Sequence, residues 1–123
     1  MASNDTPSSA LLGIDLGTSS VKVVVATFDG CVTGIGTEEY PILTPEPCYA
    51  EQDPESWWNA TVLATREALQ KANNPEIVGI GFSGQMHGTV LLDKQQKPLR
   101  PAIIWPDQRS ADLIPEIERT VGR

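Results

Sequence analysis

Short apolar runs separated by small polar residues dominate the beginning of the chain. They predict β-strands over residues 10–16, 21–28 and 31–39, because short apolar runs bounded by turn residues are typical of strands. The residues GTSS form the first turn, and Asp29-Gly30 is a strong hairpin signal at the second. Three strands joined by such short turns are expected to pair as an antiparallel meander.

A helix is predicted to begin at residues 53–54, where Asp can cap it and Pro suits its first turn. It is expected to end at the NNP of residues 73–75. Its apolar face is predicted from four positions at helical spacing, Trp58, Val62, Leu69 and Ala72. Trp57 and Trp58 suit core anchors better than ligand platforms, because aromatic residues in a first turn usually pack inwards.

The stretch between the third strand and this helix contains three prolines and is expected to be an extended loop. A further strand is predicted over residues 77–82, and residues 89–93 and 101–105 are expected to pair as a hairpin around KQQK. Residues 110–123 begin another helical pattern, and the polar residues 1–9 are expected to be a flexible tail.

A meander, a helix and a further strand, in this order, resemble the beginning of a ribonuclease-H-like or actin-like ATPase domain. The fold class is therefore predicted to be α/β, first part only: an antiparallel three-strand meander, a helix, a further strand and a hairpin. Such a domain needs more helices and strands after Arg123. Residues 10–123 are accordingly expected to be the N-terminal portion of an incomplete domain.

Composition narrows the range of partners. The 123-residue chain carries a formal net charge of −7, which argues against binding to nucleic acid or to an anionic membrane surface. Cys31 and Cys48 lack metal-ligand spacing, and two reduced thiols are favoured over a disulfide. The first residues lack the features of a signal peptide, and no apolar run is long enough for a membrane span. A cytoplasmic location is expected.

The first turn holds the candidate chemistry. Backbone N–H groups of Gly17, Thr18 and Ser19 can surround a phosphate, and Lys22 can neutralise its charge. Asp15 would repel a phosphate unless Mg²⁺, which binds one or two carboxylates and bridges to phosphate oxygens, lies between them. These residue types indicate Mg-ATP, and they equally suit a plain Asp-capped turn. The Gly-Lys-Ser/Thr of a Walker loop is absent.

GIGFSG, at residues 79–84, matches the dinucleotide-binding fingerprint GxGxxG. In such a site the first glycine ends a strand and the last lies in a following helix. Here the glycines lie inside a predicted strand and the sequence after them favours β structure, so the match is discounted. Gly79 and Gly81 are instead expected to allow close packing of a helix on the sheet.

The loop that follows this strand is a candidate substrate-binding segment. Gln85 and His87 each offer a hydrogen-bond donor and an acceptor, which suit the hydroxyl groups of a polyol. Met86 would provide an adaptable apolar wall. A lone histidine is often a structural residue, but its position between small and polar residues favours a ligand contact here.

A second candidate segment follows the predicted hairpin. Trp105 can stack on the C–H face of a sugar. Asp107 and Arg109 can bind sugar hydroxyls or form an ion pair with each other. A buried Trp105 beside a structural salt bridge explains the same residues equally well.

The motifs GIDLGTSSVKVV, YAEQDPESWW, GFSGQMHG, LLD…PLRPAIIW and WPDQR together resemble the start of an FGGY-type carbohydrate kinase, over residues 11–110. The GQMHG form is similar to that of family members that phosphorylate D-xylulose. The resemblance implies ATP and Mg²⁺ as cofactors and a sugar as substrate, and it allows a homodimer in a full-length enzyme. The residues that it implies at ATP and the metal are Asp15, Gly17, Thr18 and Lys22, with Asp15 at the metal. Those that it implies at the sugar are Met86, His87, Trp105, Asp107 and Arg109.

The chain departs from the family pattern in two ways. Pro106 stands where the family usually has a polar residue, and the family's kinases are several times longer, with their general-base aspartate further along. The resemblance therefore implies an N-terminal fragment, inactive alone, of an enzyme that converts D-xylulose to D-xylulose 5-phosphate. The alternatives are another sugar kinase of the family, such as one for gluconate, and a non-catalytic actin-like module that binds nucleotide.

Overall fold

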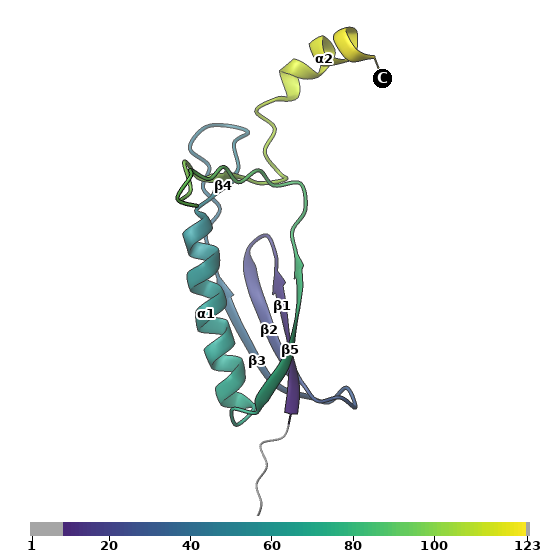
Figure 1. The fold of residues 1–123 in the computed structure, drawn as a ribbon. Helices are drawn as coiled ribbons and strands as arrows, with labels where there is room; N and C mark the ends of the chain where they lie inside the picture. The colour runs from purple at the N-terminus through teal and green to yellow at the C-terminus, as the bar shows by residue number, and fades with distance from the viewer. Residues whose placement is uncertain (1–8, 123) are drawn as a thin grey trace, which may run out of the picture. The chain divides into compact units, whose positions relative to one another are not determined.

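The computed structural model describes residues 9–122, which divide into two compact units. The first unit comprises residues 9–41 and 54–86, and the second comprises residues 42–53 and 87–122. A four-stranded sheet and one long helix form the first unit, whereas short strands and a C-terminal helix form the second (Figure 1). The predicted flexibility of residues 1–8 lies outside the described residues.

The sheet of the first unit contains strands β1 (Ser9–Leu16), β2 (Ser20–Ala26), β3 (Val32–Glu39) and β5 (Glu76–Gly84). Their order is β3-β2-β1-β5. β2 is antiparallel to both β1 and β3, and β5 is parallel to β1. The predicted meander and further strand are therefore confirmed. The predicted tail is one residue too long, because Ser9 belongs to β1 and pairs with Glu76 of β5.

Local turn chemistry explains how the meander closes. At the second turn, the Thr27 N–H donates to the Cys31 carbonyl oxygen at 2.9 Å, and Gly30 adopts a φ of +86°. Such a positive φ favours glycine, because it has no Cβ to clash with the backbone. The hairpin predicted from Asp29-Gly30 is confirmed.

Helix α1 (Pro54–Lys71) covers one face of this sheet (Figure 1), with its ends close to those predicted. Its buried positions are Ala60, Ala64 and Ala68. The predicted apolar face is therefore wrong in part, since Trp58 is 65% exposed while Trp57 and Leu69 pack against the core. The small alanines are buried because the helix backbone lies very close to the sheet.

Glycines on β3 make this close approach possible. A Cβ built on Gly34 would lie 2.1 Å from the Ala68 carbonyl oxygen, well inside van der Waals contact. The packing role predicted for Gly79 and Gly81 is corrected by this finding. A Cβ on Gly81 would have no neighbour within 4 Å, and one on Gly79 would meet only Leu11. Both glycines lie inside β5, as predicted. This position agrees with the interpretation that GIGFSG is not a dinucleotide-binding fingerprint.

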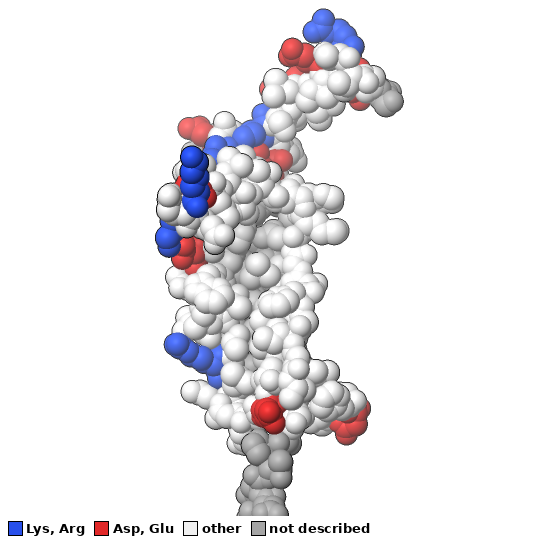
Figure 2. Space-filling model, viewed as in Figure 1, with Lys and Arg blue, Asp and Glu red and all other residues white. Residues whose placement is uncertain are grey.

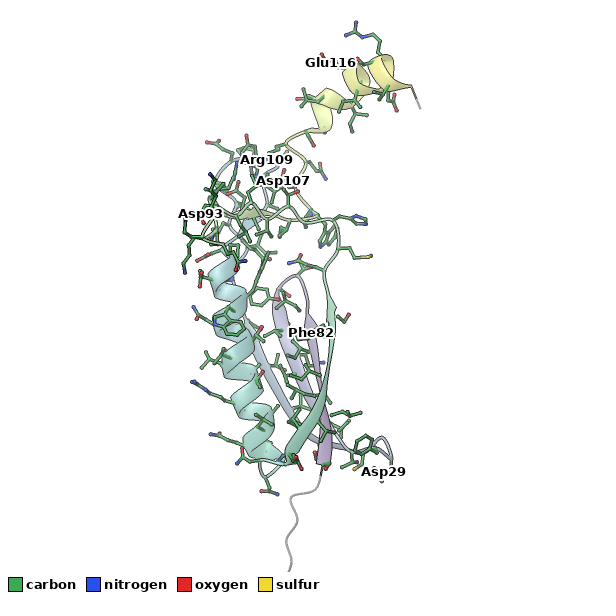
Figure 3. The ribbon with its side chains drawn as sticks, in the orientation of Figure 1. Asp29, Phe82, Asp93, Asp107, Arg109 and Glu116 are labelled. Atoms are coloured by element: carbon green, nitrogen blue, oxygen red, sulfur yellow. The ribbon has the colours of Figure 1, made fainter. Side chains whose placement is uncertain are left out.

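Beside α1, the sheet carries an open apolar groove of about 460 Å³. Figure 2 shows few charged side chains on this face between α1 and β5. Trp58 and Phe82 line the groove together with Leu12, Ile14 and Ile80. Phe82, labelled on β5 in Figure 3, is 78% exposed.

The second unit is built from short, irregular pairings. β4 (Glu51–Gln52) lies in the stretch predicted as an extended loop, and it pairs antiparallel with β6 (Ala102–Ile103). The predicted hairpin is confirmed in part: Thr89 and Ile103 exchange backbone hydrogen bonds, but β6 also uses β4 as a partner. The predicted last helix consists of a 3₁₀ helix, η1 (Ala111–Leu113), followed by α2 (Ile114–Val121).

Both cysteines, Cys31 and Cys48, are exposed and unbonded, so the predicted free thiols are confirmed. Among residues 9–122, no helix has both the length and the apolar character that a bilayer crossing requires.

Candidate phosphate turn and substrate segments

The turn between β1 and β2 is a tight hairpin closed by its own backbone. The Gly17 N–H donates to the Ser20 carbonyl oxygen at 2.9 Å. A Cβ built on Gly17 would lie 3.0 Å from the same oxygen, so a larger residue would press against the turn. Thr18 and Ser19 stand at its tip, and Ser19 is exposed.

The two charged residues of the predicted site lie directly opposite each other. Asp15 on β1 pairs in register with Lys22 on β2, and with Ser83 on the other side, on β5. Side chains alternate between the faces of a strand, and Val21 and Val23 occupy the buried face that α1 covers. Asp15, Lys22 and Ser83 therefore share the open face.

This row borders a shallow hollow of about 460 Å³ on the open face. Gly13 and Gly81 line it, and neither would bring a Cβ near another atom. The hollow therefore has a floor of backbone, with Asp15, Lys22 and Ser83 around it. Ser83 was not among the predicted site residues, and only its register opposite Asp15 reveals it.

The residues at the turn fit a magnesium ion that is held mainly by phosphate and water. Among the described residues, no three His, Cys, Asp or Glu side chains gather where they could enclose a metal. Mg²⁺ does not need such a cage, because it keeps several waters and commonly takes one or two carboxylates beside phosphate oxygens. The exposed carboxylate of Asp15 suits that role.

Tyr40, directly after β3, supports the turn from behind, and the sequence contains no motif that singles it out. Its hydroxyl donates to the Gly17 carbonyl oxygen at 2.6 Å, and its N–H donates to the Ser19 carbonyl oxygen at 3.1 Å. The side chain is buried within the hydrophobic core. Burial, and secondarily the negative charge of Asp15, raise the pKa of Tyr40 to about 12.

The first candidate substrate segment begins beside this turn. The Gln85 N–H donates to the Leu16 carbonyl oxygen at 2.8 Å, which extends the pairing of β5 with β1 as far as the phosphate turn. Met86 is 71% exposed. His87 is exposed and adopts a φ of +61°, which is unusual for a residue other than glycine.

The second candidate segment is organised by ion pairs. The Asp107 carboxylate accepts hydrogen bonds from the Ala50 N–H at 2.7 Å and from two guanidinium nitrogens of Arg109, at 2.6 and 2.8 Å. The Arg109 hydrogen bonds are the main reason why the pKa of Asp107 falls well below its usual range. Figure 3 shows the two side chains together. The alternative of a salt bridge is thus realised, whereas Trp105 is 58% exposed rather than buried.

Glu51 completes this cluster and was not predicted. It is buried, and its Oε1 accepts hydrogen bonds from Arg109 at 2.7 Å and from Arg100. The Arg109 guanidinium also lies 3.8 Å from the centre of the Tyr49 ring, a distance typical of a cation–π contact. The EQDP stretch could have indicated Glu51, but its partners are about fifty residues away in the sequence.

The predicted site residues are thus divided between the two units. Asp15, Gly17, Thr18, Ser19, Lys22, Gln85 and Met86 belong to the first, and His87, Trp105, Asp107 and Arg109 belong to the second. Within the first unit, the phosphate turn and the start of the Gln85 segment are adjacent. Within the second unit, Asp107 and Arg109 are bonded to each other. Binding of ATP, metal or sugar by these residues stays a prediction.

The sequence and the structure of this chain are similar to those of known proteins. A xylulose kinase from Escherichia coli K12 is 44% identical over 110 residues, which cover 89% of this chain and 23% of that protein. A glycerol kinase from Saccharolobus solfataricus is 38% identical over 104 residues, covering 84% of this chain and 21% of that protein. The crystal structure of a xyloylose kinase from Brucella ovis superposes with a TM-score of 0.85 at 37% identity, covering 90% of this chain and 24% of that one.

The chain therefore spans about a quarter of the length of these relatives. The family model for the N-terminal domain of FGGY carbohydrate kinases matches residues 10–123, nearly the whole chain. This chain belongs to the FGGY family of carbohydrate kinases.

Proposed function

We propose that this chain supplies the phosphate-binding hairpin and part of the sugar site of an ATP-dependent kinase that phosphorylates D-xylulose. The observation that carries the proposal is the register pair of Asp15 and Lys22, which lie on the two strands joined by the Gly17–Ser20 turn. A carboxylate and an ammonium group beside a tight turn suit the binding of a triphosphate that is complexed with a metal ion. Phosphoryl transfer depends mainly on positioning and on neutralising charge.

Each residue at the turn has a defined task in this proposal. Asp15 and the phosphate oxygens would both be ligands of Mg²⁺. Lys22, on the neighbouring strand β2, neutralises the charge of phosphate oxygens. The backbone of Thr18 and Ser19 surrounds the phosphates, whereas the Gly17 N–H, also predicted for this role, is used within the turn and donates to the Ser20 carbonyl oxygen at 2.9 Å. The metal supplies charge neutralisation when it is bound, and the β1–β2 hairpin supplies the geometry.

D-xylulose is the favoured sugar because the Escherichia coli relative, at 44% identity, is named a xylulose kinase, and the Brucella ovis structure, at 37% identity, is named a xyloylose kinase. In this proposal Gln85, Met86 and His87 bind its hydroxyl groups, and Trp105 stacks on its carbon face. Asp107 and Arg109 hold the segment that contains Trp105 through the ion pair. The glycerol kinase that is 38% identical makes glycerol the second candidate substrate.

A chimeric enzyme tests this proposal. The segment of the Escherichia coli xylulose kinase that matches this chain over 110 residues is replaced by the corresponding residues of this chain. We expect phosphorylation of D-xylulose above that of gluconate and glycerol. A chimera that folds and prefers glycerol or gluconate would overturn the assignment of the sugar. Binding of Mg-ATP without any sugar-dependent turnover would favour the non-catalytic module.

The chain on its own is the necessary companion experiment. The general base is expected outside these residues, so the 123-residue chain should show no sugar phosphorylation above background. Xylulose-dependent turnover by this chain alone, in a coupled assay for ADP, would contradict that expectation. The same preparation should bind Mg-ATP weakly through the Gly17–Ser20 turn.

A further inference from the structure

We propose that Tyr40 is a positioning residue, which holds the Gly17–Ser20 turn in its phosphate-binding shape before any ligand arrives. This inference rests on the proposed function of the turn. Tyr40 does not touch the ligand in this proposal, and it acts through the turn backbone. The support comes from its two contacts with the turn and from its burial.

The two contacts of Tyr40 hold different parts of the turn. Its hydroxyl donates to the Gly17 carbonyl oxygen at 2.6 Å, and its N–H donates to the Ser19 carbonyl oxygen at 3.1 Å. A trans peptide is planar, so its C=O and the following N–H point in opposite directions. Fixing the Gly17 carbonyl therefore also fixes the direction of the Thr18 N–H, towards the side away from Tyr40.

Burial makes Tyr40 a rigid support. The side chain is 5% exposed and belongs to the same hydrophobic core as Val21 and Leu12. A ring packed in this way cannot turn away from Gly17 without opening the core. The pKa of Tyr40 is raised to about 12, mainly by burial, so its hydroxyl keeps the proton that it donates well above the neutral range.

The turn is also held by contacts of its own. The Gly17 N–H donates to the Ser20 carbonyl oxygen at 2.9 Å, and Ser20 pairs with Glu39 in the sheet. Ordering a loop only when the ligand binds costs conformational entropy, and that cost lowers affinity. A turn that is ordered beforehand avoids the cost. Tyr40 adds to that order from its position directly after β3.

Tyr40→Phe tests the inference, because it keeps the ring in the core and removes the hydroxyl. Tyr49→Phe is the matched control, since it removes a tyrosine hydroxyl in the other unit. The ¹⁵N-labelled 123-residue chain is titrated with magnesium tripolyphosphate, which presents phosphates without adenosine. We expect Tyr40→Phe to raise the apparent Kd about three- to tenfold, as for the loss of one hydrogen bond. Tyr49→Phe should leave it unchanged.

A second measurement separates positioning from a loss of overall stability. Hydrogen exchange of the Thr18 and Ser19 amides, without ligand, should become several times faster in Tyr40→Phe. The amides of β1 and β2 should keep their exchange rates. In the unmodified chain the Gly17 and Tyr40 amides should exchange as slowly as those of the sheet, and exchange as fast as in the loop at Asp93–Lys97 would overturn the inference.

The outcomes separate the two proposals. If the unmodified chain binds magnesium tripolyphosphate and Tyr40→Phe binds it equally well, the role of Tyr40 is overturned and the function of the turn stands. If the unmodified chain shows no shift at Gly17 or Ser19 on titration, the proposed function of the turn fails and the inference fails with it. A lower Tm for Tyr40→Phe with an unchanged Kd would assign Tyr40 a purely structural role.

Discussion

Gly36 of β3 lies against Ala64 of α1 so closely that a Cβ built on the glycine would be 1.9 Å from the Ala64 carbonyl oxygen. No side chain fits in that space, and the contact sets the distance between helix and sheet. Because the helix lies so close to the sheet, only small side chains fit on the buried face of α1, and its buried residues are alanines. It also supports β3, which leads directly into Tyr40, the residue that contacts the Gly17–Ser20 turn.

Gly36→Ala is therefore expected to destabilise the fold strongly, by about 3 kcal/mol or more, because backbone atoms of α1 would have to move. Gly81→Ala is the matched control, since a Cβ there would have no neighbour within 4 Å. The control should change stability by about 0.5 kcal/mol or less. Urea unfolding followed by circular dichroism measures both variants. Equal stability of the two would contradict the close packing of α1 on β3.

Asp15→Asn is expected to abolish the magnesium dependence of nucleotide binding. In the unmodified chain, Mg²⁺ should strengthen ATP binding, because the ion separates the carboxylate from the phosphates. In the variant, Mg²⁺ should add little, while metal-free ATP binds as well as before or better, because a like charge has been removed. In the chimeric kinase the same change should lower kcat by roughly two orders of magnitude.

The control for this experiment is Asp29→Asn, which makes the same chemical change in the hairpin loop between β2 and β3 (Figure 3). It should leave the magnesium dependence intact. An Asp15→Asn variant with normal kcat and normal magnesium dependence would return Asp15 to the role of a turn former.

Asp107→Asn should change how stability depends on pH. The pKa of Asp107 is held well below its usual range, mainly by hydrogen bonds from Arg109. A carboxylate with a lowered pKa stabilises the folded state above its unfolded pKa, about 3.9, and loses that contribution as the pH falls towards the folded pKa. We expect the Tm of the unmodified chain to fall steeply below about pH 4. The variant should melt earlier at neutral pH and respond less to acid.

Asp112→Asn serves as the comparison, because Asp112 is an exposed carboxylate in η1. Its acid sensitivity should match that of the unmodified chain. Coincident curves of Tm against pH for the unmodified chain and Asp107→Asn would show that the Asp107–Arg109 ion pair adds no stability.

His87→Asn, made in the chimeric kinase, tests sugar recognition without adding backbone strain. Asn tolerates the left-handed conformation in which His87 lies, at φ +61°. If the ring contacts a sugar hydroxyl, kcat/KM for D-xylulose should fall about five- to a hundredfold, or about 1–3 kcal/mol. The KM for ATP should stay unchanged. An unchanged kcat/KM together with a lower Tm would make His87 a structural loop residue.

The sequence determined the features that depend on neighbouring residues. The turns at Gly17 and Gly30, the bounds of α1 and the strands of the meander follow from turn residues, capping residues and short apolar runs. The proximity of Asp15 and Lys22 also follows locally, because a tight hairpin places residues on its two strands opposite each other.

Only the tertiary structure decided the contacts between residues far apart in the chain. The alanine face of α1 depends on glycines of β3, so helical spacing and hydrophobicity alone favoured the bulky Trp58 instead. Tyr40 meets Gly17 across 23 positions, and Glu51 meets Arg109 across 58. These partners are chosen by close packing and by the need to pair buried polar groups. Neither requirement leaves a periodic signal in the sequence around the residues concerned.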